Sequence, residues 1–272
     1  KNSNKVKKLV DNMDMFELEK ASWLDVQIAA KVGENFGSIV GHDFVRNKNG
    51  DILIDPQTGL PKYDKSNHVL GNASWDWTGG ISTSLHYKNL SLSALFDIKV
   101  GADLYSMSAR AAHESGKSPA TLKGRDEWYH SEELRQEAGI PKGSSEWKPT
   151  GGFVAPGVID NGDGTYRKND IIINPEDYWM SVCRNAPSMF IYDNSYVKCR
   201  EIVLAYQLPK KWLGKVIQDM SVSFVARNPF IVWKNIPNID PDSNYNNTTG
   251  MGLEYGSLPS RKSYGINVNI KF

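Results

Sequence analysis

With 272 residues the chain has room for one large or two ordinary domains, and its 32 Lys and Arg nearly balance its 31 Asp and Glu, for a net charge of +1. This balance provides no basic field for nucleic acid, so no nucleic-acid partner is expected. The opening KNSNKVKKLV lacks the apolar region of a signal peptide, and no apolar run reaches the ~18 residues of a membrane helix. These features exclude a helical membrane protein, but a membrane β-barrel remains open because its signal is alternation.

The first quarter of the chain predicts short elements. The first twenty residues indicate a polar helix or a loop. Alternation in ASWLDVQIAAKVGE (21–34) and GSIVGHDFVR (37–46) predicts two strands. Turn residues on both sides of a short apolar run predict a small hairpin over 47–64.

The clearest element is a long hairpin over residues 77–100. Apolar residues occupy every second position from Trp77 to Tyr87, and the parity switches after Lys88-Asn89, so that the apolar series restarts at Leu90. A two-residue turn requires this switch, because Tyr87 and Leu90 would pair across the turn and share one side of the sheet.

The segment 102–195 loses the alternation and mixes Pro, Gly, Trp and charged residues. One helix is predicted over 131–138, capped by Ser131. A stretch of this length without regular strands far exceeds an ordinary loop and is typical of a functional or externally supported insertion.

Regular alternation returns after this insertion. In SYVKCREIVLAYQLP the apolar parity slips near Arg200-Glu201, which predicts a β-bulge. MSVSFVARNPFIVW and the terminal SYGINVNIKF predict two further strands, for about seven in all, nearly all of nine or more residues.

Strand length and aromatic spacing favour a membrane sheet over a soluble sandwich. Strands in soluble proteins usually have ~5–6 residues, whereas tilted membrane strands need ~9–11. Trp77 and Tyr87 lie ten residues apart on one apolar face. Ten residues at ~40° tilt rise about 25 Å, the height of the lipid-facing band between two aromatic girdles. Tyr196 and Tyr206 repeat the spacing across the predicted bulge.

Four stretches, in order, resemble the SusC/RagA family of TonB-dependent outer-membrane transporters of Bacteroides and its relatives. They are GNASWDWTGGISTSLHYKNLSLSALFDIKVGADLYS, DNSYVKCREIVLAYQLPKKWL, SVSFVARNPFIVWKNIPNIDPDSN and LPSRKSYGINVNIKF. Two departures are Cys199, where the family usually has Leu, and Pro229, from which the strand is expected to end one step early. The fold class implied is all-β, the C-terminal portion of a large antiparallel transmembrane barrel with long extracellular loops.

The resemblance also implies how the chain is organised. Residues 1–272 would form the C-terminal part of a TonB-dependent receptor barrel, with a loop insertion at about 102–195. The plug domain and the N-terminal strands of such a receptor are absent from this sequence, which is expected to be a fragment or one piece of a split or proteolysed chain.

The function implied is nutrient import across the outer membrane of a Gram-negative cell, with the chain as a multi-pass barrel wall in contact with outer-membrane lipid. The implied partners are TonB, which acts through the missing N-terminal part, and a SusD-like surface lipoprotein as a lid. The cargo would be a glycan or an oligopeptide. A soluble or secreted β-rich carbohydrate-binding module or adhesin is the alternative.

No motif in the sequence indicates an enzyme. The five histidines have no metal-ligand spacing, and no nucleophile or phosphate-binding motif occurs, so neither a metal nor a cofactor is expected. DNGDGTY departs from calcium-loop spacing and predicts a hairpin turn. Cys183 and Cys199 are expected to be free thiols, with one disulfide as the alternative.

Aromatic side chains fall into two groups with different expected roles. Those of the insertion are candidates for cargo binding, and the alternative is that they only pack the loops: Trp128, Tyr129, Trp147, Tyr178 and Trp179. Those of the long strands are expected at the two membrane borders: Trp77, Tyr87, Tyr196, Tyr206, Tyr264 and Phe272. The resemblance further implies that the terminal aromatic, Phe272, is an assembly signal.

Overall fold

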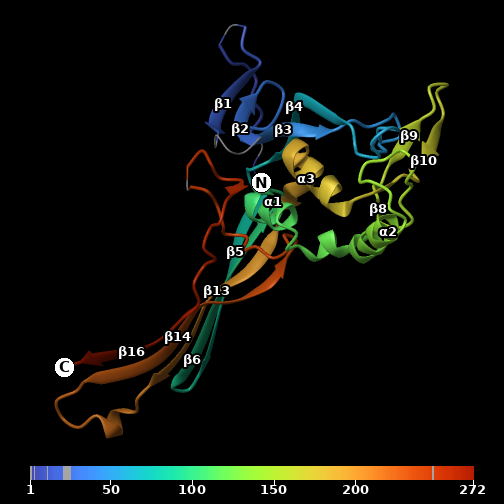
Figure 1. Ribbon diagram of the computed structural model, residues 1–272. Coiled ribbons are helices and arrows are strands. Elements are labelled where there is room, and N and C mark those ends of the chain that lie inside the picture. Colours follow the sequence, from blue (N-terminus) through green and yellow to red (C-terminus); the bar gives the residue numbers. More distant parts are fainter. Residues whose placement is uncertain (1, 3, 11, 21–25, 247) are drawn as a thin grey trace.

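The computed structural model describes residues 2, 4–10, 12–20, 26–246 and 248–272. Five of its long strands form an elongated sheet, and its helices and remaining strands gather in a body at one end of that sheet (Figure 1). The helices are α1 (Met107–Glu114), α2 (Arg125–Glu137) and α3 (Pro175–Asn185), with 3₁₀ turns η1 (Pro119–Leu122), η2 (Pro187–Phe190) and η3 (Lys210–Trp212). The strands are β1 (Met15–Lys20), β2 (Val26–Lys31), β3 (Ser38–Phe44), β4 (Tyr63–Asn72), β5 (Trp77–Tyr87), β6 (Leu90–Val100), β7 (Asp103–Ser106), β8 (Phe153–Val154), β9 (Val158–Asp160), β10 (Tyr166–Lys168), β11 (Ile172–Ile173), β12 (Ile191–Asp193), β13 (Tyr196–Gln207), β14 (Asp219–Lys234), β15 (Leu253–Glu254) and β16 (Ser263–Lys271).

The elongated sheet has five antiparallel strands in the order β16-β14-β13-β6-β5. The predicted hairpin is confirmed, since β5 and β6 are joined by Lys88-Asn89 and Tyr87 pairs with Leu90. Lys88 adopts a positive φ of 53°. The Asn89 side-chain amide donates to the carbonyl of Gln207 at 2.7 Å, which ties the turn to β13.

Side chains of the five-stranded sheet alternate between an apolar face and a polar face. One row across all five strands consists of Leu85, Leu92, Leu204, Phe224 and Ile266. The parallel row one residue away consists of His86, Ser91, Ala205, Ser223 and Asn267. Since successive residues of a strand point to opposite sides, the two rows define the two faces.

The two ends of this sheet differ. At the turn end lie the β5–β6 turn, the segment 208–218 between β13 and β14, and the end of β16. At the loop end, the chain leaves the sheet into the segments 101–195 and 235–262. The helices and the short sheets lie at the loop end, and the C-terminus lies at the turn end (Figure 1).

The predicted β-bulge in β13 is confirmed at Arg200. Cys199 pairs with Phe96, but Glu201 already pairs with Leu95, so β13 contains one residue more than β6 at this point. A bulge of this kind reverses the parity of the residues that follow it. The part of β13 before Arg200 therefore presents the opposite alternation from the part after it.

Pro229 does not end its strand, contrary to the sequence-based expectation. Strand β14 continues to Lys234, with Glu201 paired to Arg227 and Cys199 paired to Phe230. Asn228, with a φ of 47°, and Pro229 form a bulge between these two pairs. Proline lacks an amide hydrogen, and a bulge is one of the places where a sheet tolerates this loss.

The body at the loop end contains a separate four-stranded sheet in the order β1-β2-β3-β4. Strands β2 and β3 lie within the two predicted segments, while residues 21–25 of the first segment lie outside the described residues. Strand β1 occupies Met15–Lys20, so the expected polar helix or loop is wrong for these residues. One core cluster joins this sheet to η2 and β7 through Ile39, Phe190 and Tyr105, each 0% exposed.

The insertion 102–195 is more regular than the sequence indicated. It contains α1, α2, α3 and short strands. The expected helix over 131–138 corresponds to α2, which already begins at Arg125 after Gly124 (φ 81°). Ser131 is not a cap: it is buried within α2, and its hydroxyl accepts a hydrogen bond from the Thr150 amide at 3.0 Å.

Two further features bear on chemistry. Within the described ranges, no helix has the length and apolar character needed to span a membrane. Cys183 and Cys199 are free and buried, as expected. Burial raises the pKa of the Cys183 thiol to about 12, so this thiol stays protonated at neutral pH.

Candidate functional site

The candidate binding residues of the insertion lie on or between two helices of the body. Trp128 and Tyr129 lie on α2, and Tyr178 and Trp179 lie on α3. Trp128 lines two clefts, of about 590 Å³ and about 560 Å³. This position makes Trp128 the centre of the candidate site, and the clefts are called cleft A and cleft B below.

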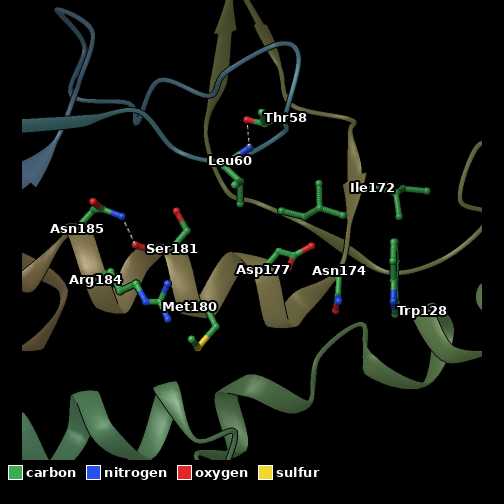
Figure 2. A pocket seen from close by; sticks show the side chains of 11 residues that line it. Thr58, Leu60, Trp128, Ile172, Asn174, Asp177, Met180, Ser181, Arg184 and Asn185 are labelled. Atoms are coloured by element: carbon green, nitrogen blue, oxygen red, sulfur yellow. Dashed lines mark hydrogen bonds between the residues drawn. The ribbon is translucent and has the colours of Figure 1, made fainter. Parts of the chain in front are cut away.

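Cleft A lies between α3, the 58–60 loop, β11 and Trp128, as Figure 2 shows. Its apolar side chains include Leu60, Ile172 and Met180. Its polar side chains come mainly from successive turns of α3: Asn174, Asp177, Ser181, Arg184 and Asn185. Each side of the cleft has an internal hydrogen bond: in the 58–60 loop the Leu60 amide donates to Thr58 Oγ1 at 3.3 Å, and on α3 Asn185 Nδ2 donates to the Ser181 carbonyl at 2.8 Å.

Cleft B lies on the other side of Trp128 and is more polar. Tyr129 and Trp179 add two further aromatic side chains to its lining. The charged residues around it have both signs: Glu114, Arg125, Glu132, Lys142 and Glu176. Aromatic surface combined with a few hydrogen-bonding groups is the usual composition of a small-ligand site.

A glycine places Trp128 between the clefts. Gly152 has a φ of 153°, and a Cβ added there would lie 2.9 Å from Trp128 Cε3 and 2.9 Å from the Ile173 carbonyl oxygen. Gly124, just before α2, lies close to the backbone at Gly152, because a Cβ added to Gly124 would lie 2.6 Å from the Gly152 carbonyl oxygen. The two glycines allow the start of α2, and with it Trp128, to contact the β8–β11 strand pair.

The other candidate aromatics of the insertion have different environments. Tyr178 is 2% exposed and packs on Phe153 with ring centroids 4.6 Å apart, and burial raises its pKa to about 12. Trp179 is 7% exposed and packs on His113 at 4.8 Å. Trp147 lies in the 138–152 loop and lines neither cleft A nor cleft B. The structure therefore brings together Trp128, Tyr129 and Trp179 at cleft B, and assigns Tyr178 to the core.

The strand aromatics Trp77, Tyr87, Tyr206 and Tyr264 lie on the apolar face, with exposures of 43%, 71%, 38% and 63%. Tyr264 stacks on Phe224 with ring centroids 6.1 Å apart. Phe272 directly follows β16 and is 72% exposed.

Tyr196 differs from these aromatics and is a correction to the expected border residues. It is 0% exposed, and its hydroxyl donates to Asp242 Oδ1 at 2.9 Å on the polar side of the sheet. The bulge at Arg200 separates Tyr196 from Tyr206 and places them on opposite faces. On the apolar face, an aromatic side chain near this level of the sheet comes instead from Trp233. It pairs with Val197, the neighbour of Tyr196, and is 46% exposed. Its position depends on the irregular register of β14, which the sequence pattern did not reveal.

A charged cluster lies on the polar face at the loop end, where Tyr196, Lys198 and Arg200 of β13 project together. Lys198 Nζ, on a side chain 2% exposed, lies 3.1 Å from Asp240 Oδ1 and 2.6 Å from Asp242 Oδ2. Arg200 lies 2.6 Å from both Asp97 and Asp242. This cluster, called the latch below, fastens the 235–262 segment to β6 and β13.

The latch carboxylates are held in their charged form. Burial alone would raise the pKa of Asp242, but hydrogen bonds from Arg200 and Lys198 outweigh it and hold the pKa well below the ordinary value. The pKa of Asp240 is also lowered. Burial would raise it, but hydrogen bonds from Ser260, Asp242 and Lys198 outweigh the effect of burial. Among the described residues, no group of three or more His, Cys, Asp or Glu side chains could hold a metal ion.

The chain is similar in sequence to two curated receptors of Formosa agariphila. It is 21% identical to TonB-dependent receptor P3 over 100% of this chain and 26% of that protein. It is also 21% identical to TonB-dependent receptor P26, over 86% of this chain and 20% of that protein. The chain thus spans about a fifth to a quarter of the length of these relatives. No protein-family model matches it.

The fold is similar to solved structures of the RagAB peptide importer. The closed-closed state matches with a TM-score of 0.57 and 16% identity over 97% of this chain and 25% of the solved chain. The open-open state matches with a TM-score of 0.54 and 16% identity, again over 25% of the solved chain. The mainly antiparallel structure confirms the expected all-β class. Sequence and fold comparisons together confirm the resemblance to SusC/RagA-like TonB-dependent transporters that the motifs of this chain indicated.

Proposed function

We propose that the chain forms part of the wall and the extracellular loops of a transporter that imports a bulky nutrient across the outer membrane. The observation that carries this proposal is the apolar face of the five-stranded sheet. The apolar row that crosses all five strands is 40% to 76% exposed at each of its positions: Leu85, Leu92, Leu204, Phe224 and Ile266. A soluble protein rarely leaves such a continuous apolar surface uncovered, whereas the strands of a membrane barrel require it.

This face also disfavours the alternative of a soluble carbohydrate-binding module. A sandwich would cover the apolar face with a second sheet. In the described part of the chain, the four-stranded sheet β1–β4 is instead joined by its core to η2 and β7, and the strands of the apolar face remain uncovered. The body at the loop end would therefore lie outside the membrane, and the turn end would lie on its periplasmic side.

The proposed machinery includes partners outside this chain. RagAB is named as a peptide importer, which supports an oligopeptide cargo, and a glycan is the other candidate. A SusD-like surface lipoprotein would cover the extracellular side, and TonB would supply energy through the rest of the receptor. Clefts A and B would contact the cargo, with Trp128 as a flat surface between them.

The first experiment tests the location. The full-length protein, expressed in its native host, is expected in the outer-membrane fraction, resistant to carbonate extraction and soluble only with detergent. Recovery of the intact protein in the aqueous fraction would contradict the proposal.

The second experiment tests the clefts. Trp128→Ala is expected to weaken cargo affinity roughly tenfold or more, because buried aromatic anchors commonly contribute ~2 kcal/mol. Tyr166→Ala is the matched control, since Tyr166 is an aromatic of the same insertion on β10, 38% exposed, and lines neither cleft. Uptake of labelled peptides and glycans is measured together with surface abundance. Equal uptake by both variants at equal abundance would reduce Trp128 to a packing residue.

A further inference from the structure

The turn end of the sheet has an unusual charge composition. The segments 88–89, 207–221 and 269–272 contain five lysines and one acidic residue, Asp219. All five lysines are exposed: Lys88, Lys210, Lys211, Lys215 and Lys271. The chain as a whole is nearly neutral, with a net charge of +1, so this concentration is local.

The charges of these lysines are not neutralised within the protein. Among the described residues, none of the five has a carboxylate within ion-pairing distance. The Asp219 carboxylate instead accepts a hydrogen bond from the Gln207 side chain. The Lys88 ammonium lies 5.3 Å from the ring centroid of Tyr87, a contact that leaves its charge available.

Exposed apolar side chains lie among the lysines. Trp212 and Val216, in the segment between β13 and β14, are 63% and 74% exposed, and Tyr87 and Phe272 are 71% and 72% exposed. The segment is ordered around Trp212, because the buried Leu213 anchors it and its amide bonds the Lys210 carbonyl at 3.1 Å. Its basic and apolar groups are therefore presented in a defined arrangement.

This surface is continuous with the apolar face. Tyr87 pairs with Leu90, Leu90 with Tyr206, and Tyr206 with Val222, and the lysines lie just beyond this row. At the loop end the latch instead contains charges of both signs that pair with one another, Lys198 and Arg200 with Asp97, Asp240 and Asp242. The five lysines of the turn end, which have no such carboxylate partners among the described residues, thus lie together at one border of the apolar face.

We propose that the turn end binds anionic phospholipid headgroups, with its lysines on the phosphates and Trp212 and Val216 at the headgroup–acyl boundary. This inference rests on the proposed membrane location of the sheet. Aromatic residues favour the membrane interface, and lysines near an anionic leaflet are attracted to it. The continuity with the apolar face selects a lipid surface over an acidic protein segment, because a partner that bound only the lysines would leave Trp212 and Val216 in water.

The experiment uses the full-length transporter in nanodiscs of phosphatidylcholine with and without phosphatidylglycerol. The variant Lys210→Gln/Lys211→Gln/Lys215→Gln is compared with the control Lys48→Gln/Lys117→Gln/Lys168→Gln, which changes three exposed lysines of the body. Native mass spectrometry counts the retained lipids. Wild type and control are expected to enrich phosphatidylglycerol over phosphatidylcholine. In the test variant this enrichment is expected to fall by a factor of roughly five for each lysine removed.

A second readout reports the position of the tryptophan. Bromine-labelled phospholipids are expected to quench wild-type fluorescence more than that of Trp212→Phe. Equal lipid enrichment in the test and control variants, or an absence of quenching from Trp212, would overturn the inference. Neither result would contradict the proposed import function. Binding of an acidic periplasmic protein in place of lipid would also overturn it. Failure of the wild-type protein to enter nanodiscs would instead contradict the membrane location itself.

Discussion

The five-stranded sheet exposes its apolar side chains, whereas the helical body buries them. Leu85 and Ile266 on the sheet are 67% and 76% exposed, whereas Leu104, Val182 and Phe190 in the body are each 0% exposed. The body has a protein core of its own, and the sheet depends on its surroundings to cover its apolar face. One chain therefore contains a region with a protein core and a region whose exposed apolar face would, on the proposed function, contact lipid.

The latch joins these two regions. Lys198 and Arg200 belong to the sheet, and Asp240 and Asp242 belong to the segment that returns toward it. Removal of one member of such a buried group leaves its partners uncompensated, which commonly costs more than the pair itself contributes. Loss of one of these charges is thus expected to weaken the attachment of the 235–262 segment to the sheet.

The largest expected effect lies in the body. Phe190→Ala removes a fully buried ring and is expected to cost about 3–5 kcal/mol of the free energy of unfolding of the body. The loss is expected in detergent and in lipid alike, because this core is enclosed by protein on all sides. Hydrogen exchange read separately on β2–β3 and on β6–β13 checks it, with Met189→Ala, a neighbour 38% exposed, as the control. Equal loss of protection in the sheet would show that the two regions unfold as one.

The next effect separates the two faces of the sheet. Ala94 lies on the apolar face near the middle of β6, and Ser93 beside it lies on the polar face. Ala94→Arg is expected to destabilise the protein in lipid by about 2–4 kcal/mol, and Ser93→Arg by much less, because only the first introduces a charge into hydrocarbon. Denaturant titration in lipid vesicles measures both. Equal costs would contradict a lipid environment for the apolar face.

The smallest effect concerns the latch and pH. The lowered pKa of Asp242 and of Asp240 means that their charged forms stabilise the folded state. This contribution is complete above the unfolded pKa of ~3.9 and is lost as the pH falls through the folded values. The thermal midpoint is therefore expected to be nearly constant from about pH 7 to pH 5 and to fall below about pH 4.

Asp242→Asn tests this assignment. The variant should be less stable at neutral pH and should lose less stability on acidification than wild type, because one of the titrating groups has been removed. Asp51→Asn changes an exposed loop aspartate and should keep the wild-type pH profile. Identical acid profiles for Asp242→Asn and wild type would assign the dependence to other groups.

Local patterns in the sequence predicted the long strands, although not the continuation of β14 past Pro229. The parity switch at Lys88-Asn89 predicted the register of β5 and β6, and the parity slip predicted the bulge at Arg200. Both follow from the period of two residues along a strand, which involves only neighbouring positions. The four-stranded sheet of the body was recognised only in part, since β1 lies in a polar stretch whose partner β2 decides its conformation.

The site was predictable in composition and not in arrangement. The aromatic residues of the insertion indicated an unusual segment, but Tyr178 packs in the core while Trp128 lines both clefts. Trp128 and Met180 both line the two clefts although they are far apart in sequence, and Gly152 leaves the room that Trp128 needs beside β11. No local pattern contains that information.

The amino-acid sequence determined the alternation, the turns and the apolar face, because each depends on the order of adjacent residues. Only the tertiary structure decided that Tyr196 turns inward toward Asp242 and that Trp233 takes its place on the apolar face. It also decided that the lysines of three separate segments gather at one end of the sheet. These outcomes depend on strand register and on contacts between distant segments, which are established only when the chain packs.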